Sequence, residues 1–149
     1  MLPRWLQTDE GVAQVFYKDE SHAQAPQLAP DEDGSIWMPD ERFANALAQN
    51  TTHEQIVLSR AVQRPISVNS IQEPAPRPAW KSKPSCFLIG EEDRMINPKT
   101  QHSMAERMNA TVRSFAIDHM PLLTAPDWIV DIILEALESN IFLRWDVKL

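Results

Sequence analysis

The sequence predicts an α/β fold in which a helical region, residues 1–79, precedes two strand–helix units of a parallel sheet, residues 80–140. Two observations carry this prediction. Strand-like and helix-like segments alternate after residue 80, as they do in parallel α/β architecture. A proline-rich stretch, residues 73–78, separates that alternation from the preceding helices and is typical of an extended connector. With 149 residues, 43% of them hydrophobic, the chain can form a core of its own.

The first region carries signals for three helices. Thr8 is a plausible N-cap for the first, followed by acidic residues and by apolar residues at helical spacing. Residues 19–41 contain prolines and a glycine and indicate a loop, with one short extended piece at residues 36–38. Pro39 favours the first turn of a second helix, and residues 52–55 have the form of a capping box that begins a third.

The second region has the clearer pattern. Residues 86–89 form a short apolar run that ends at Gly90, as a buried parallel strand does. Residues 98–108 predict a helix with Asn109 as its stop, and residues 111–115 predict a second strand. Apolar residues then recur with a period near 3.6 in a helix that starts at residues 124–126. The last residues, 141–149, are assigned to a tail outside these elements.

Charge and composition exclude several function classes. Fourteen basic against twenty-one acidic residues give a net charge of -7, so nucleic acid and anionic membrane surfaces are not expected as partners. The single cysteine, Cys86, cannot form an internal disulfide, which favours a reducing compartment. No apolar run approaches the roughly 20 residues that cross a bilayer. A cytoplasmic protein without a membrane partner is the expectation.

The informative pair of polar residues is Asp93 and His119. Each follows a predicted strand directly, and the loops at the carboxyl ends of neighbouring parallel strands lie close together. A carboxylate beside an imidazole can fix its tautomer and stabilise the imidazolium that forms when the ring takes a proton from a nucleophile. The alternative from spacing alone is that Asp93 is a turn or capping residue and His119 a surface residue.

Other titratable residues favour structural interpretations. His102 and Glu106 stand four apart on the second region's first helix, but without a third ligand nearby a surface ion pair is favoured over a metal site. Glu91 and Glu92 precede Asp93, yet adjacent acids on one loop point in different directions, so a solvated edge is favoured over paired catalytic carboxylates. No metal and no cofactor is expected.

The remaining candidates are a thiol, two histidines and three tryptophans. Cys86 lies within an apolar strand and is interpreted as a small core residue. His22 and His53 fall in a loop and in a capping segment, where a surface role is expected. The tryptophans of the helical region and the connector either line an apolar pocket or pack the core of that region; they are Trp5, Trp37 and Trp80.

The second region resembles the α/β-hydrolases, in particular the esterase and hydroxynitrile-lyase-like branch with a helical cap. Residues 84–98, PSCFLIGEEDRMINP, resemble the penultimate strand and acid loop of that family. Residues 101–108 resemble its next helix, and residues 118–126, DHMPLLTAP, its histidine loop. The resemblance implies a partial α/β-hydrolase fold with a helical cap followed by the last two strand–helix units of a parallel sheet. It implies that Asp93 is the triad acid and His119 the triad base, and that residues 8–78 form the cap.

One part of the family's pattern is missing. The nucleophile of this family is a serine in a Gly-x-Ser-x-Gly elbow, and none of the serines here lies between glycines at that spacing. The resemblance therefore implies the C-terminal portion of an ester-type hydrolase that acts on a small ester-like molecule, carries the acid and the histidine, lacks the nucleophile and is inactive alone. The alternative is a non-catalytic remnant that binds a ligand or a partner, with self-association through an open sheet edge.

Overall fold

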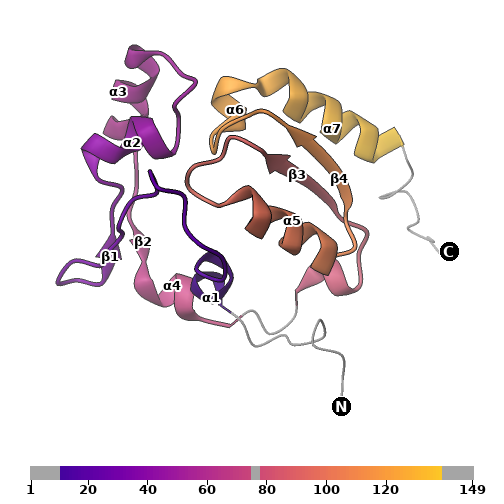
Figure 1. Cartoon of the computed structure of the whole chain (residues 1–149), viewed down its shortest axis with the longest axis horizontal. Coiled ribbons are helices and arrows are strands. Elements are labelled where there is room, and N and C mark those ends of the chain that lie inside the picture. Colours follow the sequence, from indigo (N-terminus) through magenta and orange to yellow (C-terminus); the bar gives the residue numbers. More distant parts are fainter. Residues whose placement is uncertain (1–10, 75–77, 139–149) are drawn as a thin grey trace, which may run out of the picture.

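The computed structural model describes residues 11–74 and 78–138 and has the α/β architecture that the sequence predicts. Figure 1 shows helices and a short antiparallel strand pair gathered on one side and a parallel strand pair with flanking helices on the other. Their order along the chain is α1 (Val12–Phe16), β1 (Ser35–Ile36), α2 (Asp40–Ala46), α3 (His53–Ala61), β2 (Ile66–Ser67), α4 (Val68–Gln72), a 3₁₀ turn (Ala79–Lys81), β3 (Cys86–Gly90), α5 (Pro98–Arg107), β4 (Thr111–Phe115), α6 (Pro121–Thr124) and α7 (Pro126–Glu138).

The helices of the first region begin largely where capping chemistry places them. The predicted capping box is present, since Gln55 N donates to Thr52 Oγ1 over 3.3 Å and Thr52 N donates to Gln55 Oε1 over 3.2 Å. Helix α2, the second predicted helix, buries Phe43 and Ala46. Helix α1 starts after Gly11, and the predicted cap Thr8 lies outside the described residues.

Two elements of the first region were not predicted. No element is predicted between the third helix and the connector at residues 73–78, but β2 lies there and pairs antiparallel with β1, with Ser35 opposite Ser67 and Ile36 opposite Ile66. Ser67 then caps α4 by accepting a hydrogen bond from Asn69 N over 3.3 Å. β1 overlaps the short extended piece predicted at residues 36–38, whereas β2, with only two residues, is too short to show an alternation of apolar and polar side chains.

The second region contains the predicted parallel pair. β3 and β4 run in register from Cys86 opposite Thr111 to Gly90 opposite Phe115. Figure 1 shows α5 on one face of this pair and α7 on the other. On the α7 side, Trp128 stacks on Phe115 with ring centroids 4.1 Å apart.

The connection between the two strands follows from local sequence. Asn97 caps α5 by accepting from Lys99 N over 2.9 Å, and Pro98 occupies the first turn, where its missing N–H costs no hydrogen bond. Asn109, the predicted stop, has a φ of 49°, the left-handed conformation that ends helices and that asparagine tolerates. The chain thus turns directly into β4. Residues 141–149, the predicted tail, lie outside the described residues.

The interior contains an unusual share of polar side chains. Ile89, Ala105 and Ile117 are buried between the strands and α5, and four polar residues are buried to a similar extent; these are Asp93, Thr100, Gln101 and Asp118. A buried polar group must be hydrogen-bonded to be tolerated. All four lie at or beside the carboxyl ends of β3 and β4, so this edge of the sheet is where the fold concentrates polar interactions.

Candidate functional site

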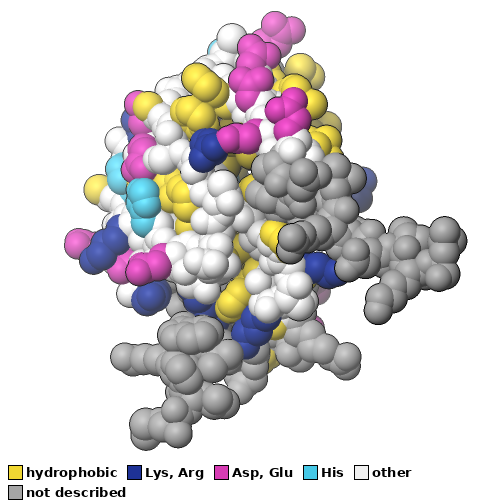
Figure 2. All heavy atoms as spheres, turned by 90° about the vertical axis from the view of Figure 1, so that its right-hand side faces the viewer, with side chains coloured by type: hydrophobic (Ala, Val, Ile, Leu, Met, Phe, Trp, Pro, Cys, Tyr) yellow, Lys and Arg dark blue, Asp and Glu magenta, His cyan; other side chains and the backbone are white. Residues whose placement is uncertain are grey.

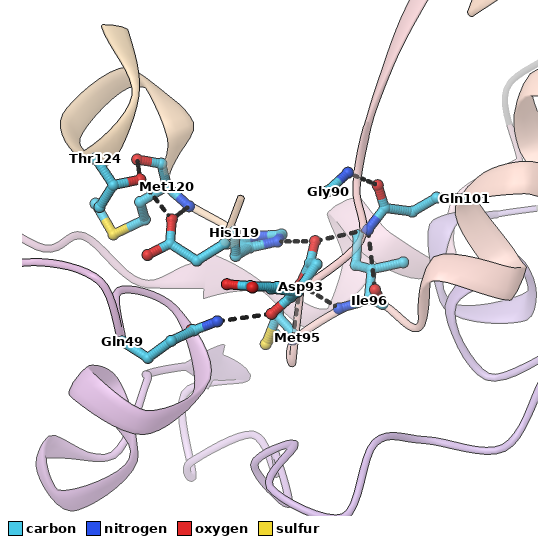
Figure 3. A network of polar contacts seen from close by, with 11 residues as sticks. Gln49, Gly90, Asp93, Met95, Ile96, Gln101, His119, Met120 and Thr124 are labelled. Carbon is cyan, nitrogen blue, oxygen red and sulfur yellow. Dashed lines mark hydrogen bonds and ion pairs between the residues drawn. The ribbon is translucent and has the colours of Figure 1, made fainter. Parts of the chain in front are cut away.

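Asp93 and His119 meet at the carboxyl ends of the two parallel strands. His119 Nδ1 lies 2.9 Å from Asp93 Oδ2, and Figure 3 shows the ring edge pointing at the carboxylate. The Asp93 side chain is 6% exposed and that of His119 is 30% exposed. The predicted proximity of the two side chains is therefore confirmed, while their catalytic roles remain a prediction.

The carboxylate of Asp93 is held by donors on both oxygens. Oδ1 accepts from Met95 N over 2.8 Å and from Ile96 N over 2.9 Å. Oδ2 accepts from Gln101 Nε2 over 2.8 Å in addition to its contact with His119. Asp93 thus closes its loop as a turn residue and also contacts the imidazole. The main-chain donors fix the direction in which Oδ2 faces.

Gln101 supports the site and was not found by the sequence reasoning. Its Nε2 donates to Asp93 Oδ2 and, over 3.0 Å, to Ile96 O, while its Oε1 accepts from Gly90 N over 3.1 Å. The signal was available, because residue 101 lies three positions before Met104 on the buried side of α5. A polar residue on an apolar helix face indicates a buried hydrogen-bonding partner.

Gly90 allows the two site loops to approach each other. A Cβ at this position would lie 2.9 Å from the carbonyl oxygen of Ile117 and 3.3 Å from that of Asp118. The pairing of the strands continues past their ends, since Glu92 N donates to Ile117 O over 3.2 Å. The absence of a side chain at Gly90 is therefore what lets the loop after β4 pass close over the end of β3.

Asp118, directly before His119, is a second buried carboxylate that the sequence reasoning did not single out. It is 2% exposed. Its Oδ1 accepts from Met120 N over 3.0 Å and from Thr124 Oγ1 over 2.7 Å, and its Oδ2 accepts from Asn50 N over 3.1 Å. An aspartate three residues before a helix that begins with proline is a signal for an Asx turn, which could have identified its local bonds but not the one to Asn50.

The first region forms hydrogen bonds with the residues on both sides of Asp93 in the acid loop. Glu92 accepts from Gln49 Nε2 at its carbonyl oxygen over 2.6 Å and from Asn50 Nδ2 at its carboxylate over 3.2 Å. On the other side, Arg94 donates to Gln24 Oε1 over 2.9 Å and to a main-chain carbonyl of α2 over 3.3 Å. The helical region is thus attached to the acid loop by polar contacts on both sides of Asp93.

Two pockets of similar size adjoin α5. One, of about 190 Å³, is lined by Asp93 and His119 together with apolar side chains of β3, α5 and the loop after β4. The other, of about 200 Å³, lies between α1 and α5 and is lined by Trp80, one of the tryptophans predicted to line a pocket or the core. Trp37 is 46% exposed, which contradicts both roles for that residue, and Trp5 lies outside the described residues.

The other histidines and acids lie away from this site. His102 Nε2 contacts Glu91 Oε1 over 2.8 Å, so its partner is Glu91 and not the predicted Glu106. Glu91 also accepts from the Ser114 hydroxyl. These hydrogen bonds, first that of Ser114 and then that of His102, lower the pKa of Glu91 below its usual value. Glu92 points instead to Asn50, so the adjacent acids diverge as expected.

The remaining candidates show no catalytic geometry. Cys86 is half-buried in β3. His22 Nδ1 accepts from the main chain of Gln24 over 3.1 Å, and His53 is exposed at the start of α3. Within residues 11–74 and 78–138, no three histidine, cysteine or acidic side chains come together as a metal site would require. Over the same part of the chain, no helix is both long enough and apolar enough to span a membrane.

Comparisons with known proteins agree with the architecture. The model of the alpha/beta hydrolase family matches residues 2–132. Among solved structures, a methylesterase from Arabidopsis superposes with a TM-score of 0.66 at 18% identity, over 76% of this chain and 52% of that one. Polyneuridine aldehyde esterase gives a TM-score of 0.60 at 17% identity, over 84% of this chain and 51% of that one. A pyrethroid hydrolase gives 0.67 at 15% identity, over 91% and 59%.

Each superposition covers a larger share of this chain than of the solved structure. Most of this chain is matched, yet it spans only about half to three fifths of the length of those structures. At these identities the likeness shows the fold alone. A search of the curated proteins finds no match.

Proposed function

This chain belongs to the alpha/beta hydrolase family, and we propose that it supplies the acid, Asp93, and the base, His119, of a Ser-His-Asp triad that hydrolyses esters. The observation that carries the proposal is the 2.9 Å contact between His119 Nδ1 and Asp93 Oδ2. An ionised carboxylate only accepts hydrogen bonds, so the Nδ1 proton faces Asp93 and Nε2 is left with its lone pair.

That tautomer is the one that general base catalysis needs. Nε2 takes the proton from the serine hydroxyl as the oxygen attacks the ester carbonyl, and the Asp93 charge stabilises the imidazolium that results. The same Nε2–H then protonates the departing alkoxide, and a water molecule repeats the sequence to release the acid. The main-chain donors at Asp93 Oδ1 keep the carboxylate from turning away during these steps.

The nucleophile is not among these 149 residues. No serine here lies in a Gly-x-Ser-x-Gly elbow, and in this family the serine precedes the acid and the histidine along the chain. We infer that the serine and the oxyanion donors come from polypeptide outside this sequence, and that this chain alone does not hydrolyse esters. The helical region, residues 1–79, would then serve as a cap, and the apolar lining of the pocket beside His119 favours a small ester with an apolar group as substrate.

A chimera tests the proposal. This chain replaces the region that it matches in the Arabidopsis methylesterase, and the remaining segments of that enzyme are kept. Hydrolysis of p-nitrophenyl acetate is then followed for the chimera, for its His119→Ala variant and for its His102→Ala variant, which removes a histidine of the same helix-and-strand unit away from the site. We expect hydrolysis that is lost with His119→Ala and retained with His102→Ala. Equal activity of the two variants would contradict the assignment of the base.

A test on the isolated chain does not depend on the chimera. With no nucleophile present, a fluorophosphonate probe should leave the protein unlabelled, and p-nitrophenyl acetate should be cleaved no faster than free imidazole cleaves it. Burst kinetics would mean that the chain contains a nucleophile of its own. In a second measurement, ¹⁵N spectra of the His119 ring should change on Asp93→Asn, because the carboxylate that holds the Nδ1 proton is gone.

The second candidate function is binding without catalysis. Among the described residues β3 pairs with β4 alone, so its other edge is open to a further strand. Helix α7 also exposes apolar side chains, and Figure 2 shows hydrophobic groups at the surface beside acidic ones; those of α7 are Trp128, Val130, Ile133, Leu134 and Leu137. Patches of this kind mark association sites. Sedimentation distinguishes the readings, since self-association favours this candidate and a monodisperse monomer opposes it.

A further inference from the structure

We propose that Asp118 is a positioning residue for His119, and that it ties the orientation of the imidazole to the turn between α2 and α3. The inference rests on the proposed function, since it names a residue that serves the same triad. The two residues that directly precede the acid and the base share a hydrogen-bonding partner. Asp118 and Glu92 are the residues directly before the base and the acid, and Asn50 donates a hydrogen bond to each of them, while Gln49 donates to Glu92 as well.

The carboxylate of Asp118 fixes the backbone of His119. Its Oδ1 accepts from Met120 N over 3.0 Å, which closes an Asx turn with His119 as the residue enclosed. The φ and ψ angles of His119 determine where its ring points, and in this turn they are set by the side chain of the preceding residue. A substitution of Asp118 is therefore expected to alter the orientation of the imidazole through the single peptide unit that joins the two residues.

Asp118 is also bound from two other elements. Thr124 Oγ1, in the last turn of α6, donates to Oδ1 over 2.7 Å, and Asn50 N donates to Oδ2 over 3.1 Å. A carboxylate that is 2% exposed needs these donors, because an unpaired charge at that depth is strongly destabilising. The loop of His119 is consequently joined to α6 on one side and to the helical region on the other.

The same turn holds the acid loop. Asn50 Nδ2 donates to Glu92 Oε2 over 3.2 Å, and Gln49 Nε2 donates to the Glu92 carbonyl over 2.6 Å. Figure 3 shows Gln49 reaching from the helical region toward the loop of Asp93. One turn of the first region thus bridges the loop of the acid and the loop of the base. The distance between Asp93 and His119 then depends on how the helical region docks.

The experiment must separate positioning from simple stabilisation. Thr124→Val removes the hydroxyl that binds Asp118 while keeping the shape and the charge of the site, and Thr124→Ser restores the hydroxyl. The readout is the ¹⁵N spectrum of the His119 ring in the isolated chain at about pH 9, where a free imidazole is neutral and its two tautomers give distinct shifts. We expect the ratio of the Nδ1–H to the Nε2–H tautomer to fall about threefold in the Val variant, as the loss of one hydrogen bond would give. The Ser variant should match the parent.

Two further variants complete the design. Asp118→Asn should lower the tautomer ratio at least as far as Thr124→Val does, while Asp131→Asn, an exposed acid of α7, should leave it unchanged. Asp93→Asn tests the proposed triad separately from the present inference. If Asp93→Asn leaves the ring spectrum unchanged, the triad reading fails.

The other outcomes concern Asp118 alone. If Asp93→Asn alters the ring while Thr124→Val and Asp118→Asn do not, the triad stands and the positioning role is wrong. A cooperative thermal transition shows which variants fold. Should Thr124→Val not fold, Asp118→Asn decides in the same way, and failure of both to fold would assign Asp118 to fold stability and overturn the proposal.

Discussion

The described part of the chain contains two contacts between a histidine and a carboxylate that are nearly equal in length and very different in setting. His119 and Asp93 are 2.9 Å apart, and His102 and Glu91 are 2.8 Å apart. Asp93 is 6% exposed, whereas Glu91 is 41% exposed. Asp93 accepts further hydrogen bonds from two main-chain N–H groups and a buried glutamine, while Glu91 has the Ser114 hydroxyl and solvent.

The difference shows that distance alone does not identify a functional pair. An exposed pair is screened by water and its side chains can change rotamer at little cost, so the contact holds neither group in place. A buried carboxylate with donors on both oxygens cannot turn, and the imidazole that contacts it is held in one orientation. The predictions below use His102 and Glu91 as the control for His119 and Asp93.

The largest expected difference is in catalysis by the methylesterase chimera. Asp93→Asn keeps the shape of the acid but replaces an acceptor with a donor, so the imidazole no longer has its Nδ1 proton held. We expect kcat to fall by about three to four orders of magnitude. Glu91→Gln should leave kcat within about twofold of the parent, since exposed charges distant from the reacting atoms contribute little. Comparable losses in the two variants would remove the distinction between the pairs.

Stability should separate the pairs in the isolated chain. Asp93→Ala leaves Met95 N, Ile96 N and Gln101 Nε2 without their acceptor, and we expect the free energy of unfolding to fall by about 2–4 kcal/mol. Glu91→Ala should lower it by no more than about 0.5 kcal/mol. Urea denaturation monitored by circular dichroism gives both values. A Glu91→Ala variant as unstable as Asp93→Ala would mean that the exposed pair also supports the fold.

Gln101 and His102 are adjacent on α5, but Gln101 donates to Asp93 whereas His102 contacts Glu91. Substituting each residue in turn therefore compares the two histidine–carboxylate contacts again. Gln101→Leu keeps an apolar interior but removes the donor to Asp93 and the acceptor for Gly90 N. Unfolding should become easier by about 1–3 kcal/mol, the cost of leaving buried groups unpaired. His102→Leu should change stability by less than about 0.5 kcal/mol. Thermal unfolding of the two variants checks this, and equal shifts would contradict the role assigned to Gln101.

The smallest effect is the pH dependence that Glu91 contributes. Its pKa in the folded chain is lowered from the usual 4.5, first by the Ser114 hydrogen bond and then by His102. A lowered pKa contributes stability that is fully present above about pH 4.5 and is lost as the pH falls through the lower, folded value. The parent should therefore exceed Glu91→Gln in Tm slightly at neutral pH, and the gap should close on acidification. A gap that widens toward low pH would contradict the direction of the shift.

The sequence predicted the second region of the fold closely. The strand ending at Gly90, the helix beginning at Pro98 and the strand at residues 111–115 each have a local signal, namely an apolar run, a proline in the first turn and β-branched residues. Asn109 could be assigned as a helix stop because its backbone tolerance is intrinsic to the residue. The division at residues 79 and 80, with the cap assigned to the first part, stays a prediction.

The features that could not be predicted are of two kinds: elements without a local sequence signal, and contacts between segments that are far apart in the chain. β2 has two residues and pairs with β1 across thirty residues of chain, and α6 is a single turn. The partner of His102 is Glu91 rather than Glu106 because the loop that follows β3, not the next turn of α5, presents the nearer carboxylate. The bond from Asn50 to Asp118 joins residues 68 apart, and no spacing rule reaches that far. Spacing did suffice for Asp93 and His119, because parallel strands bring their carboxyl ends together.

The separation along the chain of the polar contacts around the site bears on the order in which the molecule folds. Asp93 and His119 are 26 residues apart and belong to one strand–helix–strand unit, whereas the bonds that attach the first region join residues 42 to 81 apart. Closing longer loops is entropically more costly, so contacts of long separation form late unless strong local structure brings them together. The unit that holds the acid and the histidine can therefore close first, and the helical region docks onto a pair already formed. Amides of the two strands should then exchange with solvent more slowly than those of α1 and α4, since the region that docks last is also the first to detach.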